Sequence, residues 1–141
     1  MRGLAILRAA LLALAVGGCT TDVGPSPAEL KATWEAQNIV PQGYKQDLMA
    51  YMRTYLNDPS RIREAAVSPP VLKDFGPGQR FMTCVRFNAR KSDGTYAGSK
   101  EGVAVYVSGK LDRFFDVPRE VRELCKDAAY APFPELETLK R

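Results

Sequence analysis

Apolar residues recur at helical spacing in the segment that follows Gly43. They fall at positions i, i+4, i+7, i+8 and i+11, and they are Tyr44, Leu48, Tyr51, Met52 and Tyr55. A period of about 3.6 residues places them all on one side of a helix. The segment therefore predicts an amphipathic helix whose apolar side packs on a core, and Asn57-Asp58-Pro59 ends it.

A shorter helix is predicted just before this one, from about Pro27 to Gln37. Ser26 suits the N-cap, Pro27 suits the first helical position, and Glu29 completes a capping box with Ser26. Because Trp34 is the largest apolar side chain in the segment, we expect it to anchor this helix on the rest of the domain.

From Arg61 onward the pattern becomes that of strands, in which alternate residues face opposite sides. The clearest strand runs from Arg80 to Arg90. One side carries Phe81, Thr83, Val85, Phe87 and Ala89, and the other carries Cys84, Arg86, Asn88 and Arg90. This alternation predicts a half-buried strand whose second side is solvated.

Shorter strands and turns surround it. Arg61 to Ser68 is a candidate strand, which Pro69-Pro70 ends or confines to a sheet edge. Turns are predicted at Gly76-Pro77-Gly78, Ser92-Asp93-Gly94 and Ser108-Gly109, and further strands at Gly102 to Val107 and Lys110 to Phe115. Pro118 to Lys126 suits a short helix, and Ala131 to Arg141 reads as an irregular tail broken by prolines.

These elements predict a single α+β domain over residues 26–141. One or two N-terminal helices pack on an antiparallel meander of about three to four strands, and a short C-terminal helix follows. The length after residue 18 suits one domain with one core.

The first residues have the layout of a secretory signal. Arg2 and Arg8 form a basic start, and an apolar run from Ala9 to Val16 precedes Gly17-Gly18-Cys19. A membrane-spanning helix needs roughly 20 apolar residues, so this run is too short to serve as one.

The sequence Val16-Gly17-Gly18-Cys19 resembles the bacterial lipobox. The resemblance implies that residues 1–18 are a signal peptide, that Cys19 is acylated, and that residues 19–25 tether the domain to a membrane lipid layer. Asp after the acylated Cys retains such lipoproteins at the inner membrane. Thr20 stands there instead, which implies the outer membrane, facing the periplasm or, alternatively, the cell surface. An unmodified Cys19 thiol or a buried helix would be the alternatives.

Cys84 and Cys125 remain once Cys19 carries lipid. In an oxidising periplasm an even pair predicts a disulfide, which would contribute about 4 kcal/mol through the loop it closes. The alternative is two buried free thiols. No metal site is expected, because two cysteines in a chain without histidine are too few for a zinc shell.

Charge and composition exclude several function classes. Arg2 and Arg8 precede Cys19, so removing the signal peptide lowers the formal net charge from +4 to +2, which gives no case for a nucleic-acid partner. The chain has no histidine, which removes Ser-His and Cys-His nucleophiles. Ser108-Gly109-Lys110 lacks the other residues of a phosphate loop, and no cofactor is expected. Glu101, Asp112 and Asp116 are the remaining candidates for a carboxylate-dependent enzyme.

A candidate contact patch comprises Arg86, Arg90, Lys91 and Lys100. Such a basic stripe suits lipid phosphates, an acidic glycan or a protein partner. The alternative is edge protection, in which Lys and Arg discourage the addition of foreign strands. The candidates for exposed aromatic contacts are Phe114, Tyr130 and Phe133.

The sequence thus predicts an outer-membrane lipoprotein that binds an envelope protein or glycan in a non-catalytic or assembly role. One alternative is an inhibitor of a periplasmic or invading hydrolase such as lysozyme, which would use the Lys91 to Lys100 hairpin end. A small carboxylate-dependent enzyme is the third hypothesis.

Overall fold

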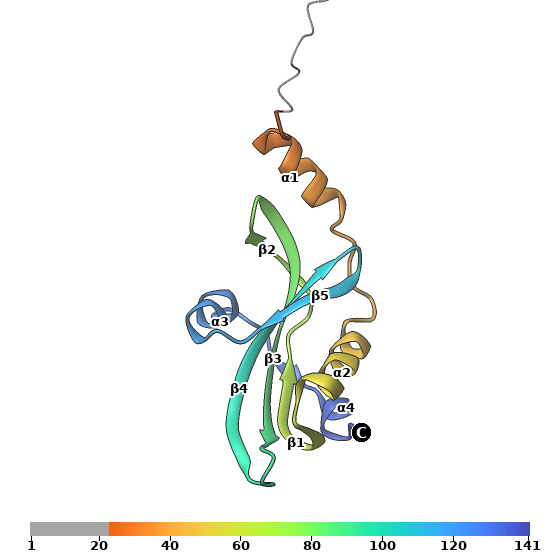
Figure 1. Cartoon of the computed structure of the whole chain (residues 1–141), viewed down its shortest axis with the longest axis vertical. Coiled ribbons are helices and arrows are strands. Elements are labelled where there is room, and N and C mark those ends of the chain that lie inside the picture. The colour runs from red at the N-terminus through yellow and green to blue at the C-terminus, as the bar shows by residue number, and fades with distance from the viewer. Residues whose placement is uncertain (1–22) are drawn as a thin grey trace, which may run out of the picture.

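An antiparallel sheet with helices on both of its sides forms the middle of the fold (Figure 1). This computed structural model describes residues 23–141. The residues predicted to form a signal peptide and Cys19 lie outside the described residues, so the predictions made for them remain predictions.

The predicted α+β class is confirmed. The helices of residues 23–141 are α1 (Pro27–Ala36), α2 (Tyr44–Tyr55), α3 (Pro118–Cys125) and α4 (Pro134–Glu137). The strands of the same range are β1 (Asp58–Val67), β2 (Val71–Phe75), β3 (Gly78–Arg90), β4 (Tyr96–Val107), β5 (Lys110–Phe115) and β6 (Ala131–Pro132). The sheet order is β5-β4-β3-β1-β6, and β2 also pairs with β3. The sheet is larger than predicted, because the sequence pattern gives no sign of β2 or β6.

The helix α2 packs as its spacing predicts. Leu48 and Met52 are fully buried against the sheet, together with Val85 and Phe87 of β3. Tyr55, at the end of the same apolar stripe, is 38% exposed, although its ring centroid lies 5.1 Å from that of Phe114 in β5.

The strand β1 contains two irregularities that shift its side-chain alternation. Its pairing with β3 changes register on either side of Arg63, and Arg61 and Glu64 adopt φ values of 55°. An extra residue in one strand of a pair moves the following side chains to the opposite side. Ile62 and Ala65 therefore both face the core, although a regular strand would turn them to opposite sides.

The second side of the sheet is not solvated along its whole length, so that prediction is wrong. The helix α3 lies on it and buries a second apolar cluster, which contains Met82, Cys84, Val103, Val105, Val121 and Cys125. Only the part of β3 from Arg86 onward remains open on this side. The periodicity of β3 alone could not show that α3 returns to cover it.

The C-terminal segment is part of the core and not an irregular tail. Phe133 and Leu136 are fully buried, and Leu139 is nearly so. The Phe133 N–H donates to the carbonyl oxygen of Ala65 over 2.8 Å, and the Ala65 N–H donates to Glu137 Oε1 over 3.0 Å. The irregular backbone of β1 thus offers hydrogen-bonding groups that hold the chain end in place.

The helix α1 begins with the predicted capping box. The Glu29 N–H donates to Ser26 Oγ over 3.2 Å, and the Ser26 N–H donates to Glu29 Oε2 over 2.7 Å. The helix lies at one end of the molecule, and the β3–β4 hairpin forms the opposite end (Figure 1).

Candidate functional site

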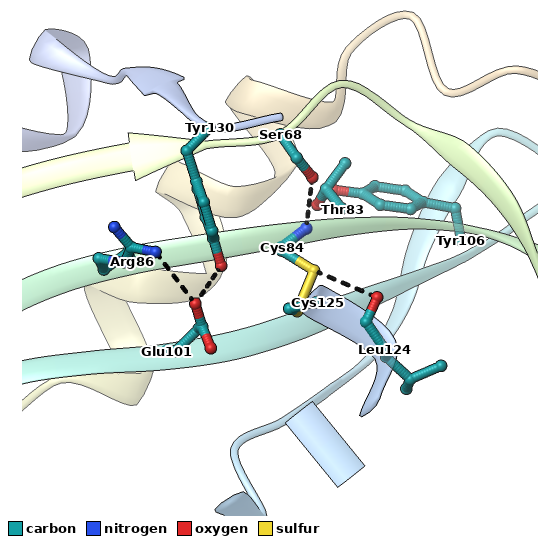
Figure 2. Close-up of a disulfide and its surroundings, with 9 residues drawn as sticks. All are labelled: Ser68, Thr83, Cys84, Arg86, Glu101, Tyr106, Leu124, Cys125 and Tyr130. Atoms are coloured by element: carbon teal, nitrogen blue, oxygen red, sulfur yellow. Dashed lines mark hydrogen bonds and ion pairs between the residues drawn. A yellow bond between two sulfur atoms is a disulfide. The ribbon is translucent and has the colours of Figure 1, made fainter. Parts of the chain in front are cut away.

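The predicted disulfide between Cys84 and Cys125 is confirmed. It joins β3 to the end of α3, with a Cα–Cα distance of 5.9 Å and a sequence separation of 41 residues (Figure 2). Both cysteines are buried, and the backbone N–H and carbonyl groups of Cys84 are hydrogen-bonded to Ser68. The Cys84 N–H donates to Ser68 Oγ over 2.8 Å, and the Ser68 N–H donates to the Cys84 carbonyl oxygen over 2.8 Å. This setting is that of a structural crosslink.

The four cations of the candidate contact patch do not share one side of the sheet, and this corrects the prediction of a single stripe. In the pairing of β3 with β4, Arg86 lies opposite Glu101, and Phe87 lies opposite Lys100. Residues directly opposite each other face the same side, and their sequence neighbours face the other side. Arg86 therefore lies on the α3 side of the sheet, whereas Lys100 lies on the α2 side with Phe87.

Arg86 is engaged by its neighbours on the α3 side. Its guanidinium lies 4.1 Å from the ring centroid of Tyr130, and its Nη2 lies 3.4 Å from Glu101 Oε2 (Figure 2). The Tyr130 hydroxyl donates to the same carboxylate oxygen over 2.6 Å. Burial, followed by this hydrogen bond to Glu101, raises the pKa of Tyr130. The three side chains form a polar cover beside the disulfide.

Arg90, Lys91 and Lys100 do come together, around a cleft of about 260 Å³ between the end of α2 and the hairpin. We call this the cationic cleft. Its other lining residues are Tyr55, Leu56, Asn57, Phe87, Ala89 and Ala97. Among the described residues that line it there is no carboxylate, so the cleft has an excess of positive charge.

The three cations differ in how far they are neutralised. Arg90 Nη2 lies 2.5 Å from Asp58 Oδ2 and donates to Ser60 Oγ over 3.2 Å. Within residues 23–141, neither Lys91 nor Lys100 lies within ion-pair distance of a carboxylate. In this range the two lysines form no ion pair, whereas Arg90 is fixed in position by Asp58. Hydrogen bonds from Thr95 and, to a smaller extent, the attraction of Lys91 lower the pKa of Asp93.

The hairpin tip between β3 and β4 is tightly hydrogen-bonded. The Lys91 N–H donates to the Thr95 carbonyl oxygen over 2.8 Å, and the Gly94 N–H donates to the Lys91 carbonyl oxygen over 3.0 Å. Asp93 Oδ1 accepts from both the N–H and the hydroxyl of Thr95. The stretch considered for hydrolase inhibition is thus a short turn followed by strand, since β4 already begins at Tyr96.

A second cleft of about 380 Å³ lies at the outer edge of β4, where β5 leads into α3. We call it the mixed-charge cleft. Its lining residues are Ser99, Lys100, Glu101, Asp116, Pro118, Val121 and Arg122. Each of its carboxylates accepts a hydrogen bond from a tyrosine hydroxyl over 2.6 Å. Tyr130 donates to Glu101, and Tyr55 donates to Asp116.

Comparisons of the chain with models of protein families, with curated proteins and with solved structures found no match.

The carboxylates considered for catalysis are only partly brought together. Glu101 and Asp116 line the same cleft, whereas Asp112 is exposed on β5, where its nearest cation is Arg113 at 3.9 Å. Among residues 23–141, His, Cys, Asp and Glu side chains form no group of three or more that could hold a metal ion. Within the same range, no helix combines the length and apolar character needed to cross a membrane.

The aromatic residues expected at the surface are less exposed than predicted. Phe133 is fully buried, which corrects its assignment, and Tyr130 is half-buried beneath Arg86. Phe114 packs against both Tyr51 and Tyr55, with ring centroids 5.0 and 5.1 Å away, and a Cβ on Gly102 would lie 2.3 Å from its ring. Phe114 therefore belongs to an aromatic cluster under α2.

Sequence reasoning missed two parts of the clefts. Tyr55, Leu56 and Asn57 form one wall of the cationic cleft because α2 ends beside the hairpin, which no local pattern indicates. The strand β4 extends back to Tyr96, although its Gly-bearing first half gives a weak strand signal. The residues Ala97 to Lys100 are all exposed and show no alternation, so no local signal marks this half as a strand.

Proposed function

We propose that this chain is an outer-membrane lipoprotein, acylated at Cys19 and facing the periplasm, with a non-catalytic binding role in the cell envelope. The cationic cleft holds an anionic group of another envelope component, a protein or a glycan. The observation that carries this proposal is the convergence of Arg90, Lys91 and Lys100 on one cleft.

The charge of the cleft supports this proposal. Hydrogen bonds to charged groups contribute roughly 1.5–3 kcal/mol each, about twice as much as neutral ones. Within residues 23–141, Lys91 and Lys100 form no ion pair, so their ammonium groups can bind a further anion. Arg90 is held in place by Asp58. A carboxylate or phosphate that enters the cleft would gain these interactions without displacing an ion pair of either lysine.

The position of the cleft suits a tethered protein. The described chain enters the domain through α1 at one end, and the hairpin lies at the other (Figure 1). A membrane anchor before α1 would therefore leave the hairpin end directed away from the lipid surface. An envelope protein or glycan, and not the anchoring membrane itself, is the partner that this orientation favours.

Site-specific photocrosslinking in cells tests the proposal. A photoreactive amino acid replaces Ala97, a neutral lining residue of the cationic cleft, and, as a matched control, the exposed Ala32 of α1 in the full-length protein. We expect a covalent adduct from position 97 that is absent from position 32 and is lost when Lys100→Glu is added. Equal adducts from both positions, or none from position 97, would refute the proposed binding role.

A further inference from the structure

The strand β4 is longer than the strand that covers its outer edge. Its pairing with β5 spans only Val103 to Val107, while β3 pairs with the other edge back to Tyr96. In the described part of the chain, the segment Tyr96–Gly102 thus has a strand on one side only (Figure 1). This open edge lies directly beside both clefts.

The direction of the backbone groups along the open edge follows from the hydrogen bonds of Cys84. Its carbonyl oxygen and N–H both bind Ser68, so they face away from β4, and the opposed residue Val103 must direct its own groups away from β3. Backbone groups alternate along a strand, so those of Ser99 and Glu101 point to the open edge. The Gly98 N–H, which donates to Asn88 Oδ1 on β3 over 3.0 Å, fits the same alternation.

The open edge has a hollow on each side of the sheet. The cationic cleft is lined by Ala97 and Lys100 of this segment, and the mixed-charge cleft by Ser99, Lys100 and Glu101. A strand added along the edge would direct alternate side chains to opposite sides. One set would enter the cationic cleft, and the other would lie against Pro118, Val121 and Arg122.

We propose that the open edge of β4 takes an extended segment of a partner protein as an added strand, with its acidic side chains in the cationic cleft. This inference rests on the proposed function and specifies the partner of the same cleft. Strand addition provides main-chain hydrogen bonds to Ser99 and Glu101, and the two clefts select the side chains. The expected sequence alternates acidic residues with apolar ones.

The features that protect this edge agree with such a partner. Lys100 and the positive φ of Gly98 discourage the addition of an arbitrary strand, because they add charge and distort the edge. The Lys100 ammonium attracts a strand that carries acidic side chains. The open edge therefore selects an added strand by its charge and still allows a strand to pair with it.

The test uses purified full-length protein in detergent and an acetylated, amidated octapeptide of alternating glutamate and valine. Its lysine–valine counterpart is the matched control peptide. We expect calorimetric binding of the acidic peptide, with at least about a tenfold preference over the basic one. Hydrogen exchange at the Ser99 and Glu101 amides should slow when the acidic peptide is added. Absence of binding, or equal binding of both peptides, would overturn the proposal.

Substitutions separate strand addition from simple charge attraction. Proline is tolerated where the N–H of an edge strand faces outward, so Ser99→Pro should keep the fold but weaken acidic-peptide binding about tenfold relative to Ser99→Ala. If Lys100→Glu abolishes binding while Ser99→Pro binds like Ser99→Ala, strand addition is wrong and the cationic cleft stands. If Ser99→Pro does not fold, unchanged amide exchange at Ser99 and Glu101 of the wild type on peptide addition would equally exclude strand addition. A wild-type dimer that Ser99→Pro converts to a monomer would show that the edge takes a second copy of this chain, which also overturns the proposal.

Discussion

The guanidinium of Arg80 lies against the indole ring of Trp34, with its Cζ 3.8 Å from the ring centroid. Arg80 is only 2% exposed, and it donates hydrogen bonds to the Trp34 carbonyl oxygen and, over 2.8 Å, to Gln37 Oε1. Burial lowers the pKa of Arg80. Because carbonyl groups at a helix C-terminus carry partial negative charge, this cation stabilises the end of α1.

The same contact explains the glycines at the turn between β2 and β3. A Cβ on Gly76 would lie 3.1 Å from the Trp34 ring, and one on Gly78 would lie 3.2 Å from it. The turn therefore needs glycine both for its positive φ at Gly76 and for the close approach of Trp34. None of the residues Pro27–Ala36 is buried, and besides its contact with Arg80 the Trp34 ring centroid lies 6.5 Å from that of Phe75 in β2.

Replacing Arg80 should release α1 from the sheet. We expect Arg80→Met to lower the free energy of unfolding by about 2–3 kcal/mol, because charge-assisted hydrogen bonds and a cation–π contact are lost. Urea denaturation measures the loss, and hydrogen exchange should quicken within α1. The exposed Lys31→Ala is the control and should change stability by less than about 0.5 kcal/mol. Unaltered exchange in α1 of Arg80→Met would contradict this account of the contact.

Removing the disulfide should destabilise the domain strongly. The double variant Cys84→Ala, Cys125→Ala frees a 41-residue loop, for which chain entropy predicts a loss of about 4 kcal/mol. Urea denaturation under oxidising conditions compares it with the parent protein. Addition of a reductant should shift the midpoint of the parent and leave that of the variant unchanged. Coinciding midpoints for the parent and the variant would show that the crosslink contributes nothing.

Alkaline pH should destabilise the protein through tyrosines whose pKa is raised in the folded state. Burial is the largest cause that raises the pKa of Tyr55, Tyr106 and Tyr130 in the folded state. A raised folded pKa means that the stabilisation is fully present below the unfolded value, about 10, and is lost as pH rises toward the folded value. Absorbance near the phenolate band should therefore rise together with loss of near-ultraviolet circular dichroism. Phenolate formation by these tyrosines in a protein that remains folded would contradict the prediction.

Tyr106→Phe provides the matched control for the alkaline transition. The Tyr106 hydroxyl lies 3.1 Å from Thr83 Oγ1, so its removal leaves the Thr83 hydroxyl without this partner and lowers stability at neutral pH. The variant should nevertheless lose less stability between neutral and alkaline pH than the parent. An equal loss in both proteins would show that Tyr106 does not contribute to the alkaline transition.

The C-terminal segment should be essential for stability. Leu136 is fully buried against β1, so Leu136→Ala should cost about 2–5 kcal/mol through lost burial and a cavity. Thermal unfolding measures the effect, with the exposed Lys140→Ala as the control. If Leu136→Ala melts like the control, the chain end is not part of the core in solution.

Acylation of Cys19 is testable by mass. We expect the mature protein to begin at residue 19, to carry the mass of attached acyl chains, and to sediment with membranes. Two or more chains hold a protein stably, at about 0.8 kcal/mol per buried methylene. The Cys19→Ser variant should be unacylated and lost from the membrane fraction. A wild-type protein that still begins at Met1 without lipid would rule out the anchor, and with it the outer-membrane part of the proposed function.

Features that depend on neighbours along the chain could be predicted from the order of the residues. The 3.6-residue period of α2, the capping box at Ser26 and the alternation of β3 could all be predicted, because helix and strand geometry fix which nearby residues share a side. The Cys84–Cys125 pairing was also accessible, since only one partner remained for each cysteine once Cys19 was assigned to lipid.

Which sides of the sheet are covered, and which cations lie together, follow from contacts between distant segments. The return of α3 over Cys84, the docking of Phe133 on the irregular backbone of β1, and the open edge of β4 all depend on contacts between segments far apart in sequence. The four patch cations were separated by the register of β3 against β4, which sends Arg86 to one side and Lys100 to the other. Pairing register and layer packing are set by the summed burial of the whole chain, and a local pattern does not contain that sum.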